Sequence, residues 1–145
     1  MIKILCVGKI KENYLNELIN DYLKRISKYH KIEIIELKDN PIYEKEISSL
    51  LEKIDKKDYN IALDPRGKLY KSEELAIKID KIFNEKSTIT FIIGGSNGLN
   101  DEIRSLCNEI ISFSDLTFPH GLFRGILLEQ IYRIFKINNN ETYHK

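Results

Sequence analysis

Apolar residues follow two alternating patterns along this chain, short continuous runs and stripes with helical spacing. Continuous runs such as residues 88–93 are typical of strands that are buried on both faces of a parallel sheet. Residues 14–26 instead place apolar side chains three and four positions apart, which is the pattern of an amphipathic helix. The predicted strands span residues 1–8, 32–37, 59–63, 88–93 and 110–113.

The predicted helices lie between these strands, at residues 14–26, 44–54, 72–83, 100–107 and 122–137. Ser72 is expected to cap the third helix, because a serine hydroxyl can accept a hydrogen bond from a free N–H of the first turn. Strands that alternate with helices predict an α/β fold, with a mostly parallel sheet flanked by helices. A chain of 145 residues fits one domain, residues 1–145.

The last predicted helix has a broad apolar arc. Its members are Leu122, Phe123, Ile126, Leu127, Ile131, Ile134 and Phe135. Such an arc fits a terminal helix buried within its own domain. It also fits a helix that packs against the sheet on one side and against a second subunit on the other, and periodicity alone does not separate the two.

Three loops are expected to meet at the carboxyl ends of the strands, where open α/β sheets bind their ligands. They are residues 63–67, 94–98 and 114–120. In the first loop, Pro65 and Gly67 favour a type I turn that ends the third strand at Asp64. In the second loop, three glycines let a ligand approach the main chain closely. A small-molecule pocket is therefore a better interpretation than a glycine-rich turn without a ligand.

The order of these glycines limits the kind of ligand. Gly94, Gly95 and Gly98 do not follow the G-x-G-x-x-G order, and no Walker A lysine comes after them, so a phosphate-rich cofactor is disfavoured. An adenosine-type ligand fits better, with apolar walls from Leu63, Ile93, Leu116 and Phe118. His120, which begins the last helix, either titrates near neutrality or orients the start of that helix.

The charges of the chain nearly cancel, since 23 Lys and Arg residues face 22 Asp and Glu residues and leave a net charge of +1. A protein that binds nucleic acid through its whole surface would be more basic, so any RNA contact must use a local patch. The two cysteines have no partners at metal-ligand spacing, and no metal site is expected. No apolar run suits a membrane span or a signal peptide, and a cytoplasmic location is expected.

A series of short motifs follows along nearly the whole chain. They are Val7-Gly-Lys9, Asp21-Tyr-Leu-Lys-Arg25, Leu63-Asp64, Gly67-Lys68, Ile93-Gly-Gly-Ser-Asn-Gly98, Leu116-Thr-Phe-Pro-His120, Glu129-Gln-Ile-Tyr-Arg133 and Tyr143-His144. In this order the motifs resemble the ribosomal RNA large subunit methyltransferase H family, within the SPOUT class of trefoil-knotted methyltransferases. No single motif is specific, but the ordered set is.

The resemblance implies a homodimer that transfers a methyl group from S-adenosyl-L-methionine to N3 of a pseudouridine in the helix 69 loop of 23S rRNA, within the ribosome and without a metal. It also implies a SPOUT-type fold with a C-terminal trefoil knot. The implied cofactor-binding residues are Leu63, Gly94, Gly95, Phe113, Ser114, Asp115, Leu116, Thr117 and Phe118. The implied candidates for the proton acceptor are His120, Glu129 and His144, and the implied RNA contacts are Arg124, Arg133, Tyr143 and Lys145.

Two other functions are compatible with the same sequence. One is a SPOUT methyltransferase that acts on tRNA. The other is a regulatory module that binds an adenosine nucleotide and catalyses nothing. The net charge of +1 favours an assembled ribosome over free RNA as the substrate, because ribosomal shape would then supply part of the recognition.

Overall fold

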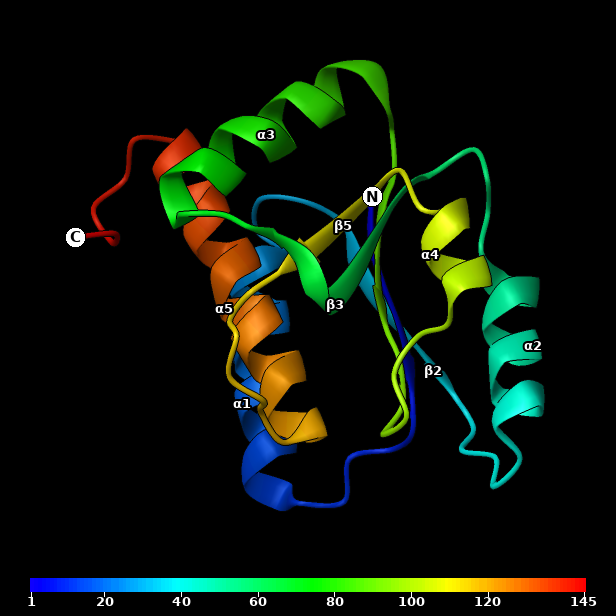
Figure 1. The fold of residues 1–145 in the computed structure, drawn as a ribbon. Helices are drawn as coiled ribbons and strands as arrows, with labels where there is room; N and C mark the ends of the chain where they lie inside the picture. Colours follow the sequence, from blue (N-terminus) through cyan, green and yellow to red (C-terminus); the bar gives the residue numbers. More distant parts are fainter.

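Five parallel strands form a single sheet in the computed structural model, which describes residues 1–145 (Figure 1). The strands are β1 (Ile2–Val7), β2 (Ile32–Leu37), β3 (Tyr59–Leu69), β4 (Ile89–Ile93) and β5 (Glu109–Ser112). Their order in the sheet is β2-β1-β4-β3-β5. The central strand, β4, is buried at every position, as its continuous apolar run predicts.

Helices cover both faces of the sheet (Figure 1). The helices are α1 (Asn13–Ile26), α2 (Tyr43–Lys53), α3 (Ser72–Glu85), α4 (Asp101–Leu106) and α5 (His120–Asn138). Helices α1, α3 and α5 pack on one face, over the larger core of 23 buried residues, and α2 and α4 pack on the other, over a core of 8. Along β1, Ile4 and Cys6 enter the larger core while Leu5 and Val7 enter the smaller one, which is the two-residue period of a strand. The predicted α/β class is confirmed.

Helix α5 obtains its two-sided burial from its own chain. It packs between α1 and α3 and contributes Leu127, Leu128 and Ile131 to the larger core. Its broad apolar arc is thus accounted for within one subunit, although Leu122 remains 37% exposed at the start of the helix. None of the helices is both long enough and apolar enough to cross a membrane.

The prediction that the third strand stops at Asp64 is wrong. Strand β3 runs on to Leu69 and pairs with β5 twice, first through residues 61–63 and again through Lys68 and Leu69. The register shifts between Leu63 and Lys68, so residues 64–67 form a bulge between two paired stretches. Pairing with β5 therefore overrides the local turn preference of Pro65 and Gly67.

The prediction that Ser72 caps α3 is also wrong. Lys71 occupies the N-cap position, and its backbone N–H donates to the carboxylate of Glu74 at 2.8 Å. Ser72 is the first helical residue, and its hydroxyl donates to Oε1 of Gln130 on α5 at 2.8 Å. The serine therefore joins α3 to α5, because a partner on a neighbouring helix replaces the local cap.

Gly67 lies where the backbone of β5 leaves no room for a side chain. A Cβ atom at this position would lie 2.6 Å from backbone atoms of Ile110 and Ile111. Atoms of a paired strand cannot move aside as the end of a flexible side chain can. Only glycine lets β3 resume its pairing with β5 after the bulge.

We expect Gly67→Ala to lower the free energy of unfolding by about 2 kcal/mol, because the new methyl group forces β3 and β5 apart. Urea denaturation followed by circular dichroism measures the change. Gly121→Ala is the matched control, since its Cβ would meet side-chain atoms and no backbone, with a methyl group of Leu15 nearest at 3.0 Å and Ile10 at 3.6 Å. Equal losses of stability in the two variants would contradict the close approach of Gly67 to β5.

Candidate active site

A cavity opens where the carboxyl ends of β3, β4 and β5 meet, and we call it the sheet-edge cavity. The three loops that the sequence places at this edge all contribute to it. Its lining consists of Leu63, Asp64, Pro65, Ile93, Gly94, Gly95, Gly98, Leu99, Ile111, Ser112, Phe113, Ser114, Leu116, Thr117, Phe118 and Phe123. Eight of the nine residues implied as cofactor-binding are among them, and the ninth, Asp115, is exposed and lies outside the lining.

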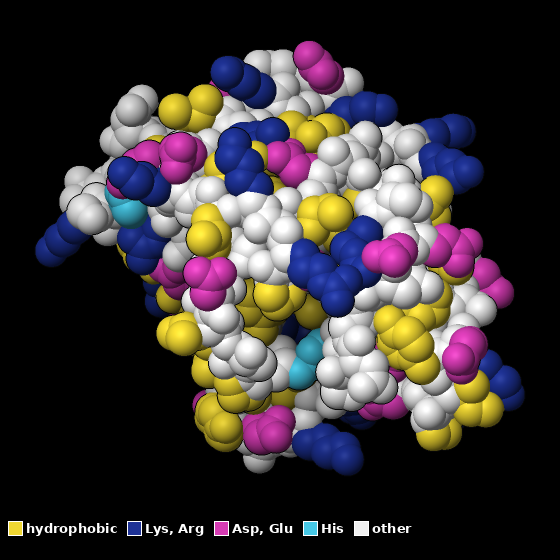
Figure 2. Space-filling view, in the orientation of Figure 1, with side chains coloured by type: hydrophobic (Ala, Val, Ile, Leu, Met, Phe, Trp, Pro, Cys, Tyr) yellow, Lys and Arg dark blue, Asp and Glu magenta, His cyan; other side chains and the backbone are white.

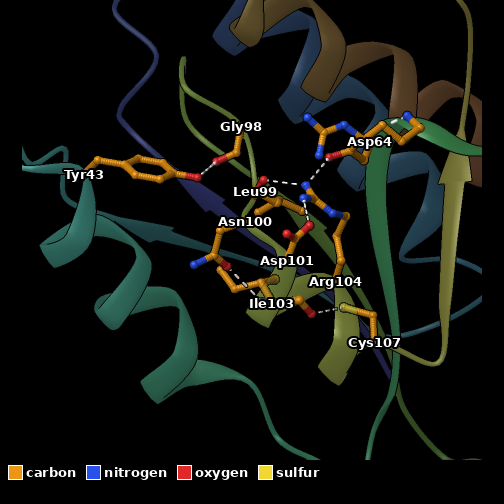
Figure 3. Close-up of polar contacts among 10 residues, drawn as sticks. Tyr43, Asp64, Gly98, Leu99, Asn100, Asp101, Ile103, Arg104 and Cys107 are labelled. Atoms are coloured by element: carbon orange, nitrogen blue, oxygen red, sulfur yellow. Dashed lines mark hydrogen bonds and ion pairs between the residues drawn. The ribbon is translucent and has the colours of Figure 1, made fainter.

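The glycine loop at this cavity is folded tightly onto itself. The N–H of Gly98 donates to the carbonyl of Gly95 at 2.9 Å, and Gly98 has a φ of +73°. A Cβ at Gly94 would lie 2.7 Å from the carbonyl carbon of Gly98. The hydroxyl of Tyr43, from α2, donates to the carbonyl of Gly98 at 3.2 Å and holds the loop from outside (Figure 3). The loop therefore presents main chain, not side chains, to the cavity.

The lining of the sheet-edge cavity has a definite chemical character. It includes aromatic and aliphatic side chains, a few hydroxyls and one acidic side chain, Asp64, but no lysine or arginine. The sequence places Asp64 in a loop at this edge and in the Leu63-Asp64 motif, but Asp64 is not among the residues implied as cofactor-binding. The signal was present, since Asp64 directly follows Leu63 in the loop expected to face the ligand.

A second cavity lies beside the first, where α5 begins, and we call it the helix-start cavity. Its lining includes Gly8, Asp39, Gly95, His120 and Arg124, so Gly95 borders both cavities. Figure 2 shows a hollow in this face of the molecule, with hydrophobic side chains along one side and Lys and Arg side chains above it. Two binding compartments therefore meet at the main chain of Gly95.

His120 makes a hydrogen bond at this second cavity through one of its ring nitrogens. Its Nε2 lies 2.9 Å from the carbonyl oxygen of Val7. Because a carbonyl oxygen only accepts hydrogen bonds, Nε2 is the donor, and Nδ1 is the ring nitrogen left to act as a proton acceptor. No protein group bonds Nδ1. Both readings of His120 from the sequence are therefore compatible with the geometry, because the residue anchors the start of α5 and still offers a basic nitrogen.

Arg124, one turn further along α5, is buried, with 2% of its surface exposed. Its guanidinium donates one hydrogen bond to the carboxylate of Glu36 and another to the carbonyl oxygen of Gly8, the second at 3.1 Å. The Nε atom has no hydrogen-bond partner. In this structure the side chain ties α5 to β1 and β2. A contact between Arg124 and RNA stays a prediction.

Glu46 stands behind Gly95 as a buried acid. Its carboxylate oxygens would lie 2.8 Å from a Cβ at Gly95, so no side chain fits there without displacing them. Burial raises the pKa of Glu46, the carboxylate of Asp39 raises it further, and His120 opposes the rise. The sequence does not identify Glu46 as a site residue, because a glutamate in a predicted helix is typical of a solvated surface position.

The other predicted residues gather near the end of α5, in what we call the tail cluster. Glu129 accepts hydrogen bonds from the guanidinium of Arg133, from Tyr143 at 3.0 Å and from Gln130 at 2.8 Å. Desolvation and hydrogen bonds with Tyr22 and Glu129 raise the pKa of Tyr143. The structure thus brings Glu129, Arg133 and Tyr143 together through direct contacts.

His144 completes the tail cluster. Its Nδ1 accepts from Nη1 of Arg133 at 3.0 Å, and its Nε2 donates to Oε1 of Glu73 at 2.7 Å. An arginine only donates, so Nδ1 is the acceptor of this pair, and both ring nitrogens are occupied. Lys145 is exposed beyond this network.

The predicted residues therefore fall into two groups along one helix. Glu129 lies nine residues after His120, which corresponds to about 14 Å along a helix axis. The three candidate proton acceptors do not form one cluster within a single chain. No group of three or more His, Cys, Asp and Glu side chains in the structure could hold a metal ion.

Comparison with known proteins identifies the family of this chain. The family model described as "Predicted SPOUT methyltransferase" matches residues 1–144. The chain belongs to the SPOUT methyltransferase family. As a member of this family of methyltransferases, it requires a site for a methyl donor, and the sheet-edge cavity lies at the strand ends where such a ligand is expected.

Close relatives cover this SPOUT chain from end to end. A protein of Methanococcus maripaludis (strain C5) is 48% identical, with 99% of both chains covered. Proteins of Bacillus cereus (strain ATCC 14579) and Bacillus thuringiensis (strain Al Hakam) are each 45% identical, also with 99% of both chains covered. Both Bacillus proteins are named ribosomal RNA large subunit methyltransferase H.

A solved structure shares the same fold. It is titled a "probable methylase family protein" from Haemophilus influenzae Rd KW20, and it matches with a TM-score of 0.59 at 14% sequence identity. The match covers 99% of this chain and 70% of that chain. At this identity the likeness shows the fold alone.

We expect Glu129→Gln to loosen the C-terminal tail of this SPOUT protein, because a neutral amide accepts weaker hydrogen bonds from Tyr143 and Arg133 than a carboxylate does. Carboxypeptidase Y should release the last residues about threefold to tenfold faster, as followed by mass spectrometry. Glu102→Gln, at an exposed position of α4, is the control. Identical release from wild type and Glu129→Gln would show that Glu129 does not hold the tail.

Proposed function

We propose that the protein transfers a methyl group from S-adenosyl-L-methionine to N3 of a pseudouridine in the helix 69 loop of 23S rRNA, acting in the cytoplasm on the assembled ribosome. One observation carries this proposal. Eight of the nine residues implied as cofactor-binding line one cavity of this chain, and its full-length Bacillus relatives are named ribosomal RNA large subunit methyltransferase H.

The sheet-edge cavity suits S-adenosyl-L-methionine. Ile93, Leu116 and Phe118 offer apolar walls to an adenosine group, and the glycine loop offers backbone groups. The lining holds no lysine or arginine to pair with phosphates, and the charge of its one acidic side chain, Asp64, is already paired with Arg104. This composition favours the methyl donor over an adenosine nucleotide. When bound, the donor supplies a methyl group on a positively charged sulfur.

His120 is the best-placed proton acceptor. Nitrogen N3 of a pseudouridine carries a proton that it must lose before it can attack a methyl group. The hydrogen bond from Nε2 to Val7 fixes the ring and leaves Nδ1 able to take that proton at the helix-start cavity, which meets the sheet-edge cavity at Gly95. In Glu129 and His144, by contrast, hydrogen bonds within the tail cluster already occupy the basic atoms.

Local basic surface would contact the RNA. Lys9, which lines the helix-start cavity, and Arg66, on the bulge after Leu63, are both exposed beside the two cavities. Arg133, Tyr143 and Lys145 form a second contact region at the tail. Because the net charge is only +1, shape recognition on the ribosome would supplement these few contacts.

A homodimer would complete the site. Within one chain the tail cluster lies about 14 Å along α5 from His120, so a tail that meets the two cavities would come from a second copy. Tyr14, Leu116 and Leu122 are 69%, 73% and 37% exposed around the cavities, and a second subunit would cover such apolar side chains. The C-terminal trefoil knot, a rare feature of folds, is proposed on the family resemblance alone.

The proposed function predicts methyl transfer from labelled S-adenosyl-L-methionine to ribosomes that lack their normal methylations. We expect label on assembled ribosomes, at a pseudouridine of 23S rRNA, and little label on free large-subunit RNA or on tRNA. Label on tRNA would show that the substrate is tRNA, while the reaction would still be methyl transfer. Binding of the donor without transfer to any RNA would favour a non-catalytic module and contradict the proposal.

We expect His120→Ala to slow single-turnover methylation about 100-fold at saturating donor, because N3 then lacks a proton acceptor. Raising the pH should restore part of the rate, since N3 then loses its proton to solvent. His144→Ala serves as the comparison and should retain the rate of the chemical step while binding ribosomes more weakly. A full rate in His120→Ala would exclude His120 as the proton acceptor.

A further inference from the structure

Arg104, on the short helix α4, reaches from behind the sheet-edge cavity to two of its loops (Figure 3). Its side chain is only 10% exposed. Arg104 is not part of the cavity lining, although it bonds residues that are.

The guanidinium of Arg104 joins segments that are far apart in the sequence. Its Nη1 donates to Oδ2 of Asp64 at 3.2 Å and to the carbonyl oxygen of Leu99 at 2.5 Å. Asp64 and Leu99 both line the sheet-edge cavity, the first after β3 and the second after the glycine loop. The two contacts therefore fix the separation between two walls of the cavity (Figure 3).

The pair with Asp64 is shielded from water. The side chain of Asp64 is 8% exposed, and its other oxygen, Oδ1, accepts the backbone N–H of Arg66 at 2.9 Å. Both carboxylate oxygens are thus satisfied, and loss of Arg104 would leave a buried charge uncompensated. The third partner, Asp101, is 98% exposed, and its hydrogen bond from Arg104 lowers the pKa of that carboxyl group without joining it to the cavity.

The base of Arg104 is itself held in place. Asn100 caps α4 by accepting the N–H of Ile103 at 3.0 Å. On the other side of the glycine loop, Tyr43 donates to the carbonyl of Gly98. The arginine therefore projects from a fixed support. The two N–H groups of its planar Nη1 hold Asp64 and Leu99 in fixed directions, which a rotating lysine ammonium does less well.

We propose that Arg104 is a positioning residue of the methyl-donor site, which holds Asp64 and Leu99 at the spacing that the donor requires. The inference rests on the proposed function of the sheet-edge cavity. Arg104 acts through these two residues and does not itself touch the donor. Its effect should therefore fall on donor affinity and not on the chemical step.

Isothermal titration calorimetry with S-adenosyl-L-methionine tests this role on the full chain. We expect Arg104→Met to raise the Kd about tenfold or more and Arg104→Lys to raise it less, while single-turnover methylation at saturating donor stays near the wild-type rate. Arg25→Met, which breaks an exposed pair with Asp21 on α1, is the matched arginine control and should leave the Kd within about twofold. Asp101→Asn should also leave the Kd within about twofold, because Asp101 is exposed and does not line the cavity.

A double-mutant cycle separates positioning from a general loss of stability. Asp64→Asn alone should weaken binding, and adding it to Arg104→Met should cause little further loss, because both changes break the same link. Additive losses, or an unchanged Kd in Arg104→Met, would overturn the role of Arg104 and leave the proposed function intact. If Arg104→Met does not fold, Arg104→Lys with wild-type affinity would overturn it equally. A wild-type protein that does not bind the donor would overturn the proposed function, and this inference with it.

Discussion

The double pairing of β3 with β5 is the constraint on which the candidate site depends. The two strands pair before the bulge and again after it, so residues 64–67 are held at the carboxyl edge of the sheet, facing the segment that follows β5. Gly67 makes the second pairing possible, because the backbone of β5 occupies the space of any side chain there. Without that pairing, Asp64 and Pro65 would belong to an ordinary surface loop, and the cavity would lack one of its walls.

Much of this arrangement could be predicted from the sequence, because length and apolar spacing distinguish the strands from the helices and parallel strands gather their loops at one edge. The continuation of β3 could not, since Pro65 and Gly67 signal a turn locally, while the partner Ile111 lies far along the chain from Lys68. Ser72 has a cap signal, but its partner Gln130 is on a different helix. Arg104 gave no signal at all, because an arginine on a short polar helix has the pattern of a surface residue until the fold brings Asp64 to it.

Helix α5 has different physical characters at its two ends. At its start, His120 and Arg124 both bind backbone carbonyls at the end of β1, so this strand positions the proposed proton acceptor without lining the sheet-edge cavity. Toward its other end, Glu129, Arg133, Tyr143 and His144 are joined by hydrogen bonds, and His144 also bonds Glu73 of α3. The first end keeps an open basic atom beside a cavity, whereas the second keeps none.

The order of the cavity residues along the chain has a consequence for how the protein is made. The lining begins at Leu63 and ends at Phe123, and every strand pairing in the sheet is parallel, so each pairing must wait for a complete crossover to be synthesised. A nascent chain that has emerged only as far as the glycine loop lacks the whole wall from Ile111 to Phe123. Such an incomplete copy lacks one side of the cavity, so we expect a small ligand to bind only after Phe123 has left the ribosome that produces the chain.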